Sequence, residues 1–167
     1  EVMGEGTLHH LDDLGLIDDH IGPAGMAAIA RAIGACPALT RFRLDDNHIG
    51  DEGLAALSEA LTRGAVPALE ILGLGGNGIG DLGLDSLTRA LWATDSALAR
   101  LRWLGLSRNQ ITDEGVRAFS HVIGLGAMPQ LGDIGLRSNA ITDDGLKTFD
   151  RGHPCWAGAP APPPSQP

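Results

Sequence analysis

Apolar residues recur along this chain in one pattern with a period of about 30 residues. Each copy reads L-x-x-L-x-L-x-x-N-x-I, then x-D-x-G and a stretch with apolar residues at helical spacing; other apolar residues replace some of the Leu and Ile. The copies start at Leu11, Leu39, Leu69, Leu101 and Leu131, and we number them repeat 1 to repeat 5. The chain is therefore expected to consist of five equivalent units.

Each repeat contains the patterns of a strand and of a helix. Around L-x-L, as at Leu104 and Leu106, apolar and outward-facing positions alternate, which is typical of a half-buried strand. After the Gly, apolar residues at the first, fourth and eighth places, such as Leu54, Leu57 and Leu61, form one helical stripe. An Asp two positions before the Gly is expected to cap each helix and to complement its dipole. These residues are Asp51, Asp81, Asp113 and Asp143.

The Asn of the pattern predicts how the repeats are joined. It lies where the chain leaves the strand, and its amide can bond to backbone groups of neighbouring repeats. The predicted Asn ladder consists of Asn47, Asn77, Asn109 and Asn139. Repeat 1 has Asp19 at this place and Pro23 in place of the later Asp, so we expect it to be the least regular repeat.

The pattern resembles the leucine-rich repeat family, and the repeat length resembles its ribonuclease-inhibitor-like subclass, which includes repeats of NOD-like receptors and of Ran GTPase-activating protein. The resemblance implies an α/β fold, a right-handed leucine-rich-repeat solenoid. In this horseshoe arc, parallel strands form the concave face and helices form the convex face. It also implies a non-catalytic module or scaffold that binds a protein partner.

The domain organisation follows from where the pattern starts and stops. We expect residues 1–10 to be the remnant of a preceding repeat or an N-terminal segment, and residues 11–152 to form the repeat domain. Residues 153–167 are rich in Pro and are predicted to be a disordered tail, with Trp156 folding back over the open end. Because nothing before Leu11 resembles a polar cap, we expect the chain to be a fragment of a longer repeat protein.

The solvent-facing side of the strands, which we call the sheet face, is the predicted partner-binding surface. Its outward positions form three columns, and four repeats have Gly in the middle one. The candidate contact residues are Asp13, Arg41, Arg43, Asp45, Ile71, Gly73, Trp103, Gly105, Asp133 and Arg137. In one interpretation the glycines let a partner approach closely, with Trp103 and Ile71 as an apolar anchor. In the other, Trp103 and its neighbours lie across the glycines without any partner.

Composition narrows the classes of partner. The formal net charge is −9, which argues against nucleic-acid binding, because that binding depends on clustered Lys and Arg. No apolar run is long enough to cross a bilayer. The two cysteines, Cys36 and Cys155, have no metal-ligand spacing and fit a reducing compartment. We therefore expect a cytoplasmic monomer without cofactor or metal, and no catalytic residues.

Three alternatives arise from single motifs. Gly73, Gly75 and Gly78 have the G-x-G-x-x-G spacing of a dinucleotide site, but the other repeats have no Gly equivalent to the last two, and Asp95 is poorly placed as the ribose ligand. His20 and His48 occupy equivalent places in adjacent repeats and are too few for a zinc site. A GTPase-activating role of the Ran type would need an exposed Arg or Asn, for which Arg108 and Asn109 are the candidates.

Overall fold

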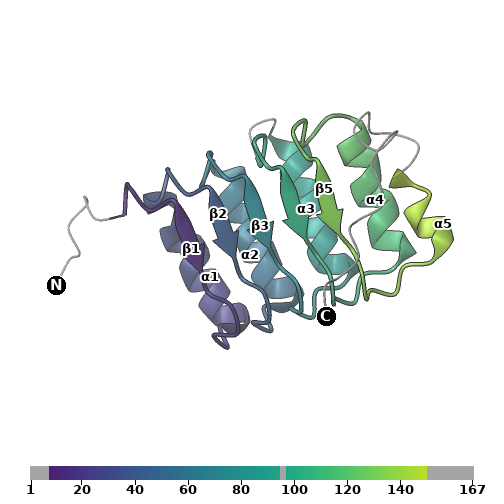
Figure 1. Cartoon of the computed structure of the whole chain (residues 1–167), viewed down its shortest axis with the longest axis horizontal. Helices are drawn as coiled ribbons and strands as arrows, with labels where there is room; N and C mark the ends of the chain where they lie inside the picture. The colour runs from purple at the N-terminus through teal and green to yellow at the C-terminus, as the bar shows by residue number, and fades with distance from the viewer. Residues whose placement is uncertain (1–7, 95–96, 150–167) are drawn as a thin grey trace, which may run out of the picture.

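The computed structural model describes residues 8–94 and 97–149, and each repeat in it is a short strand followed by a helix (Figure 1). The elements are β1 (Asp13–Gly15), α1 (Gly22–Ala32), the 3-10 helix η1 (Ile33–Ala35), β2 (Arg41–Arg43), α2 (Gly50–Thr62), β3 (Ile71–Gly73), α3 (Asp81–Ala93), β4 (Trp103–Gly105), α4 (Asp113–Gly124), β5 (Asp133–Gly135) and α5 (Asp143–Leu146). Repeat boundaries read from the sequence thus coincide with strand–helix units.

The strands form one parallel sheet in chain order, β1-β2-β3-β4-β5, and the helices lie together on one side of it (Figure 1). Every neighbouring pair has the same register: Leu14 is opposite Phe42, then Leu72, Leu104 and Ile134. The sheet does not close on itself, because β1 and β5 are edge strands among the described residues. The predicted α/β leucine-rich-repeat solenoid is therefore confirmed.

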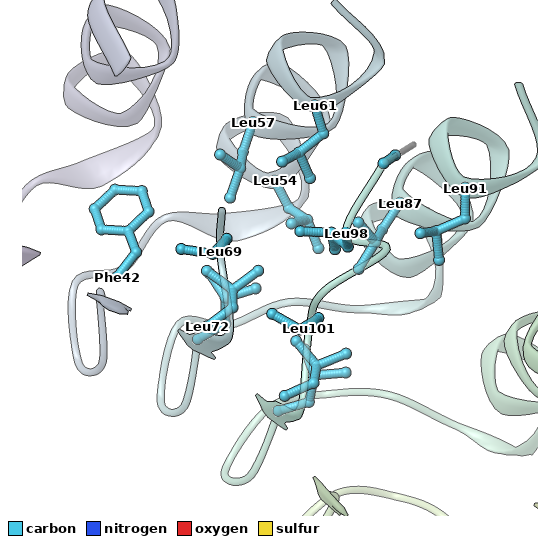
Figure 2. Close-up of a cluster of buried hydrophobic side chains, with 14 of the residues drawn as sticks. Phe42, Leu54, Leu57, Leu61, Leu69, Leu72, Leu87, Leu91, Leu98 and Leu101 are labelled. Atoms are coloured by element: carbon cyan, nitrogen blue, oxygen red, sulfur yellow. The ribbon is translucent and has the colours of Figure 1, made fainter. Parts of the chain in front are cut away.

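The core lies between the sheet and the helices. In repeats 2, 3 and 4 every apolar position of the pattern is buried, and Leu44, Leu74 and Leu106 are each 0% exposed. Figure 2 shows side chains from strands, such as Leu72, and from helices, such as Leu54, meeting in one apolar layer. The aliphatic spine is thus continuous through the middle of the molecule.

The end repeats bury less of the same pattern. Leu11, Leu14 and Leu16 of repeat 1 are only partly buried. In repeat 5, Leu146 is 47% exposed, although its position in the pattern predicts a core residue. Each repeat covers its neighbours, so a repeat with one neighbour leaves part of its apolar surface open.

The Asn ladder forms as predicted and joins consecutive repeats. Asn77 is fully buried, and its Nδ2 donates to the carbonyl oxygens of Leu44 at 2.9 Å and Gly75 at 3.1 Å. Its Oδ1 accepts from the backbone amides of Asn47 at 3.0 Å and Ile49 at 3.3 Å. Asn47 and Asn109 each accept from the two equivalent backbone amides and donate to the preceding repeat, whereas Asn139 donates to the Leu106 carbonyl oxygen and accepts from the Ile111 amide. Each amide therefore bonds to the strand and to the turn of the preceding repeat.

The predicted Asp caps are wrong, and the structure gives these residues another role. Asp81 and Asp113 are the first residues of α3 and α4, and their carboxylates accept bonds from the next repeat rather than from their own helix. Asp81 Oδ1 accepts from the Thr112 amide at 2.8 Å, and Oδ2 accepts from Thr112 Oγ1 at 2.6 Å. Thr112 in turn caps α4, accepting from the Glu114 amide at 3.2 Å. We call these contacts the Asp ladder.

The Asp ladder extends from repeat 2 to repeat 5. Asp51 Oδ1 accepts from the Gly80 amide at 2.7 Å, and Asp113 accepts from the amide and hydroxyl of Thr142 at 2.7 and 2.6 Å. The bonds from Thr142, with a smaller contribution from the charge of Arg117, hold the pKa of Asp113 below its ordinary value.

Repeat 1 differs at this position because Pro23 has no carboxylate. The Gly50 amide therefore donates to the Asn77 carbonyl oxygen instead, and the backbone of Gly50 is left-handed. β1 itself keeps the common register, and among the described repeats only repeat 1 has a 3-10 helix after its α-helix.

Several predictions fall outside the described residues: the segment before Leu8, the end of the repeat domain after Phe149, the Pro-rich tail with Trp156, and Asp95 and Cys155. Within residues 8–94 and 97–149, no helix has the length and hydropathy of a bilayer-spanning segment.

Candidate functional site

The sheet face places the predicted contact residues in straight rows across the strands. The strand register aligns Asp13, Arg41, Ile71, Trp103 and Asp133 in one row, and Gly15, Arg43, Gly73, Gly105 and Gly135 in the next. Neighbours in a row are one strand spacing apart, about 4.8 Å. Arg41, Arg43, Asp133 and Arg137 are exposed, while Asp13, Asp45, Ile71 and Trp103 are partly exposed.

The charged residues of repeats 1 and 2 bind one another. Asp13 Oδ2 accepts from Arg41 Nε at 3.0 Å, and Asp13 Oδ1 accepts from Arg43 Nη2 at 3.0 Å. The same carboxylate thus holds two guanidinium groups from the following strand. Because all three side chains are between 30% and 48% exposed, these pairs add little to stability, about 1 kcal/mol or less each.

Neighbouring side chains fill the space above the Gly row. A methyl group at Gly73 would lie 2.4 Å from Asp45 Oδ2, and one at Gly105 would lie 2.4 Å from Trp103 Cη2. The six-membered ring of Trp103 therefore lies over Gly105 of its own strand. Gly73 and Gly105 are buried, so these two predicted contact residues lie beneath the surface that Asp45 and Trp103 present.

A second ion pair crosses the sheet face over repeat 3. Arg108 Nη2 donates to Asp46 Oδ2 at 2.8 Å, although these residues belong to repeats 4 and 2. Between them lies Gly76, where a methyl group would be 2.0 Å from Asp46 Oδ1. All residues at this register position have positive φ, including Asp46 and Arg108, so glycine is needed here for space and not for backbone conformation.

Sequence reasoning missed this ion pair, which could have been found from opposite charges at the same pattern position on either side of a glycine. The pair also bears on the GTPase-activating alternative. The guanidinium of Arg108 is held by Asp46, and Asn109 is buried with its amide bonded in the Asn ladder.

The C-terminal part of the sheet face is different, because no described residue bonds to its polar side chains. Among the described residues, no hydrogen bond or ion pair reaches the Asp133 carboxylate, the Arg137 guanidinium or the Trp103 indole N–H. No buried side-chain polar atom lacks a partner in that part of the chain, so the indole N–H faces solvent. On the sheet face, the side chains with hydrogen-bonding groups that no described residue uses are therefore in repeats 4 and 5.

The other candidate motifs do not form sites. The ring centroids of His20 and His48 are 6.3 Å apart, and the described residues contain no group of three His, Cys, Asp or Glu side chains around a common point. The Gly75 amide donates to the Asp45 carboxylate at 2.9 Å, which places a negative charge where a dinucleotide phosphate would have to bind. Burial raises the pKa of the Cys36 thiol, which favours the unreactive protonated form.

Comparison with known proteins identifies the repeat. A family model described as Leucine Rich repeat matches residues 35–58, 67–87, 101–120 and 131–149, together about half of the chain. No curated protein matches the sequence at a significant level. The matched segments are repeats 2 to 5, in which strand, Asn and helix recur at the same register. The chain therefore belongs to the leucine-rich repeat family.

Proposed function

We propose that this protein is a non-catalytic scaffold that binds a protein partner through its sheet face, and that it is of the ribonuclease-inhibitor-like subclass. Leucine-rich repeats generally mediate protein–protein interactions. A repeat of about 30 residues with a helix in each of repeats 1 to 5 supports the subclass.

One observation carries the proposal. The core positions keep the same residue types in all repeats, whereas the row Asp13, Arg41, Ile71, Trp103 and Asp133 changes chemistry at almost every step. Stacking of the repeats depends little on these side chains, because the Asp13–Arg41 pair that joins two of them is exposed to water, so the row is able to specify a partner. Trp and Arg are also the residue types enriched in binding hot spots.

The test compares the partly exposed Trp103 of the sheet face with the exposed Trp92 of helix α3. Trp103→Ala removes the aromatic residue of the sheet face, and Trp92→Ala removes a 68% exposed tryptophan near the end of α3. We expect Trp103→Ala to lower quantitative capture of partner proteins from a lysate about tenfold or more, as for a hot-spot residue. Trp92→Ala should leave capture unchanged.

A charge-reversal variant completes the test. Arg41→Glu changes the other end of the same row without altering the core, and circular dichroism checks that each variant is folded. Unchanged capture by both Trp103→Ala and Arg41→Glu would exclude the sheet face as the binding surface.

A GTPase-activating activity is not part of the proposal, because Arg108 and Asn109 are both engaged within the protein. Single-turnover GTP hydrolysis with small GTPases checks this point. Acceleration that Arg108→Ala abolishes would favour the catalytic alternative.

A further inference from the structure

The same register position has Asp in repeat 1 and in repeat 5, but the two carboxylates are in different situations. Asp13 is bound by Arg41 and Arg43, both on the next strand. Asp133 is on β5, the last strand of the described chain, and no cationic side chain among the described residues forms an ion pair with it. Neither Arg102 nor Arg137, which are near it in sequence, forms an ion pair with it.

Repeat 1 thus shows what a carboxylate at this position of the sheet face binds. Arg41 donates through Nε and Arg43 through Nη2, and these two guanidinium groups occupy both oxygens of Asp13 at 3.0 Å. Planar guanidinium groups match carboxylates geometrically better than ammonium groups do. Asp13 and Asp133 share one row of the sheet, and the neighbouring strand described at Asp133 is β4, on the side of Trp103.

The neighbours of Asp133 in the row provide the second half of a cation site. Trp103 is directly opposite Asp133, and Ile71 is directly opposite Trp103. The Trp103 ring lies over Gly105, along its own strand, and is partly exposed. A guanidinium group that binds Asp133 can therefore stack on the indole, an arrangement that stabilises bound Arg.

We infer that Ile71, Trp103 and Asp133 form a surface site that binds an arginine side chain of the partner protein. The arginine contacts Asp133 and Trp103, and an apolar side chain of the partner, next to that arginine, contacts Ile71. This inference rests on the proposed function of the sheet face. The net charge of −9 supports it, because an acidic protein attracts basic partners over long distances. A partner carboxylate at the exposed, unpaired Arg137 is the competing possibility, and the test distinguishes the two.

The probe is a library of short random peptides displayed on phage and selected against the full chain. The selected peptides are first tested against two variants. We retain the peptides that lose binding to the Trp103→Ala variant and still bind the Trp92→Ala variant. We expect the retained peptides to contain Arg next to an apolar residue. Replacing that Arg by citrulline, which has the same shape without the charge, should lower affinity about tenfold or more.

Asp133→Asn locates the charge contact. This substitution should lower the affinity for the Arg peptide about tenfold, and it should remove the difference in affinity between the Arg and citrulline peptides. Asp85→Asn is the matched control, since it removes the same charge from a partly exposed carboxylate on α3, on the helix side of the sheet. It should leave peptide affinity unchanged.

The outcomes separate the inference from the function on which it rests. Retained peptides that lack Arg, that tolerate citrulline, or that depend on an acidic residue and Arg137 would overturn the arginine site and leave sheet-face binding intact. Equal binding of Lys and Arg peptides would overturn the guanidinium assignment. If no selected peptide depends on Trp103, the arginine site and the proposed binding surface both fail.

Discussion

At the scale of single residues, the Asn ladder shows how one side-chain type is required by hydrogen bonding. Asn77 is buried, and its side chain donates to the carbonyl oxygens of Leu44 and Gly75 and accepts from the backbone amides of Asn47 and Ile49. Asp cannot donate and Leu can do neither, so only an amide satisfies all four backbone groups. Asp19 stands at this position only in repeat 1, where it is exposed to water.

Asn77→Ala is therefore expected to destabilise the protein by about 3 kcal/mol, because it leaves buried backbone donors and acceptors unpaired. Urea unfolding followed by circular dichroism measures this cost. Asn139→Ala is the matched control: it removes the amide at the same pattern position of repeat 5, where Asn139 is partly exposed, accepts from one backbone amide and loses bonds that water replaces, at a cost of about 1 kcal/mol. Equal costs at the two positions would contradict this account.

At the scale of elements, the helices are positioned by a contact between neighbouring repeats that combines Asp and Gly. A methyl group at Gly115 would lie 2.4 Å from Asp81 Oδ1, and one at Gly145 would lie 2.2 Å from Asp113 Oδ1. The Gly at the start of each of these helices therefore makes room for the carboxylate of the preceding repeat. In the D-x-G sequence, the Asp therefore contacts the following repeat and the Gly contacts the preceding one. The Asp does not cap its own helix.

This coupling predicts a non-additive pair of substitutions. Gly115→Ala should cost about 2 kcal/mol through the clash with Asp81, and Asp81→Ala should cost about 2 kcal/mol through lost bonds to Thr112. In the double variant the clash is largely removed, so the combined cost should fall short of the sum by about 1 kcal/mol or more.

Denaturant unfolding of the two single variants and the double variant measures this interaction energy. Gly34→Ala serves as the control, because nothing lies within 4 Å of a methyl group there, and it should change stability by about 0.5 kcal/mol or less. Additive costs at Gly115 and Asp81 would show that the two residues act independently.

At the scale of the whole molecule, stability is distributed along the stack. Each repeat contacts only its neighbours, so the free energy of unfolding is the sum of repeat terms and interface terms. Repeats 2 to 4 have two interfaces and a fully buried spine, whereas repeats 1 and 5 have one interface among the described residues and keep apolar side chains partly exposed. The ends of the described stack are therefore expected to open first.

Equivalent substitutions along the spine test this distribution. Leu74→Ala, at a fully buried position of repeat 3, should cost about 3 to 5 kcal/mol. Leu136→Ala, at the same position of partly buried repeat 5, should cost about half as much, because less apolar surface leaves the core. Hydrogen exchange gives an independent measurement: amides of β3 should be protected more strongly than those of β1 and β5. Uniform protection across the strands would contradict the nearest-neighbour description.

The sequence alone determined the repeat, the strand register, the buried spine and the Asn ladder. These features follow from periodicity, because a position that recurs in every unit must occupy equivalent surroundings. The row from Asp13 to Asp133 was predicted for the same reason, and the register confirms its alignment.

Tertiary structure decided the contacts that depend on where individual side chains point. The Asp ladder, the Asp46–Arg108 pair over Gly76 and the placement of Trp103 over Gly105 depend on side-chain direction and on distances between repeats, which periodicity does not specify. The same holds for the unpaired carboxylate of Asp133. The sequence shows that it is acidic, but only the arrangement of its neighbours shows that no described residue forms an ion pair with it.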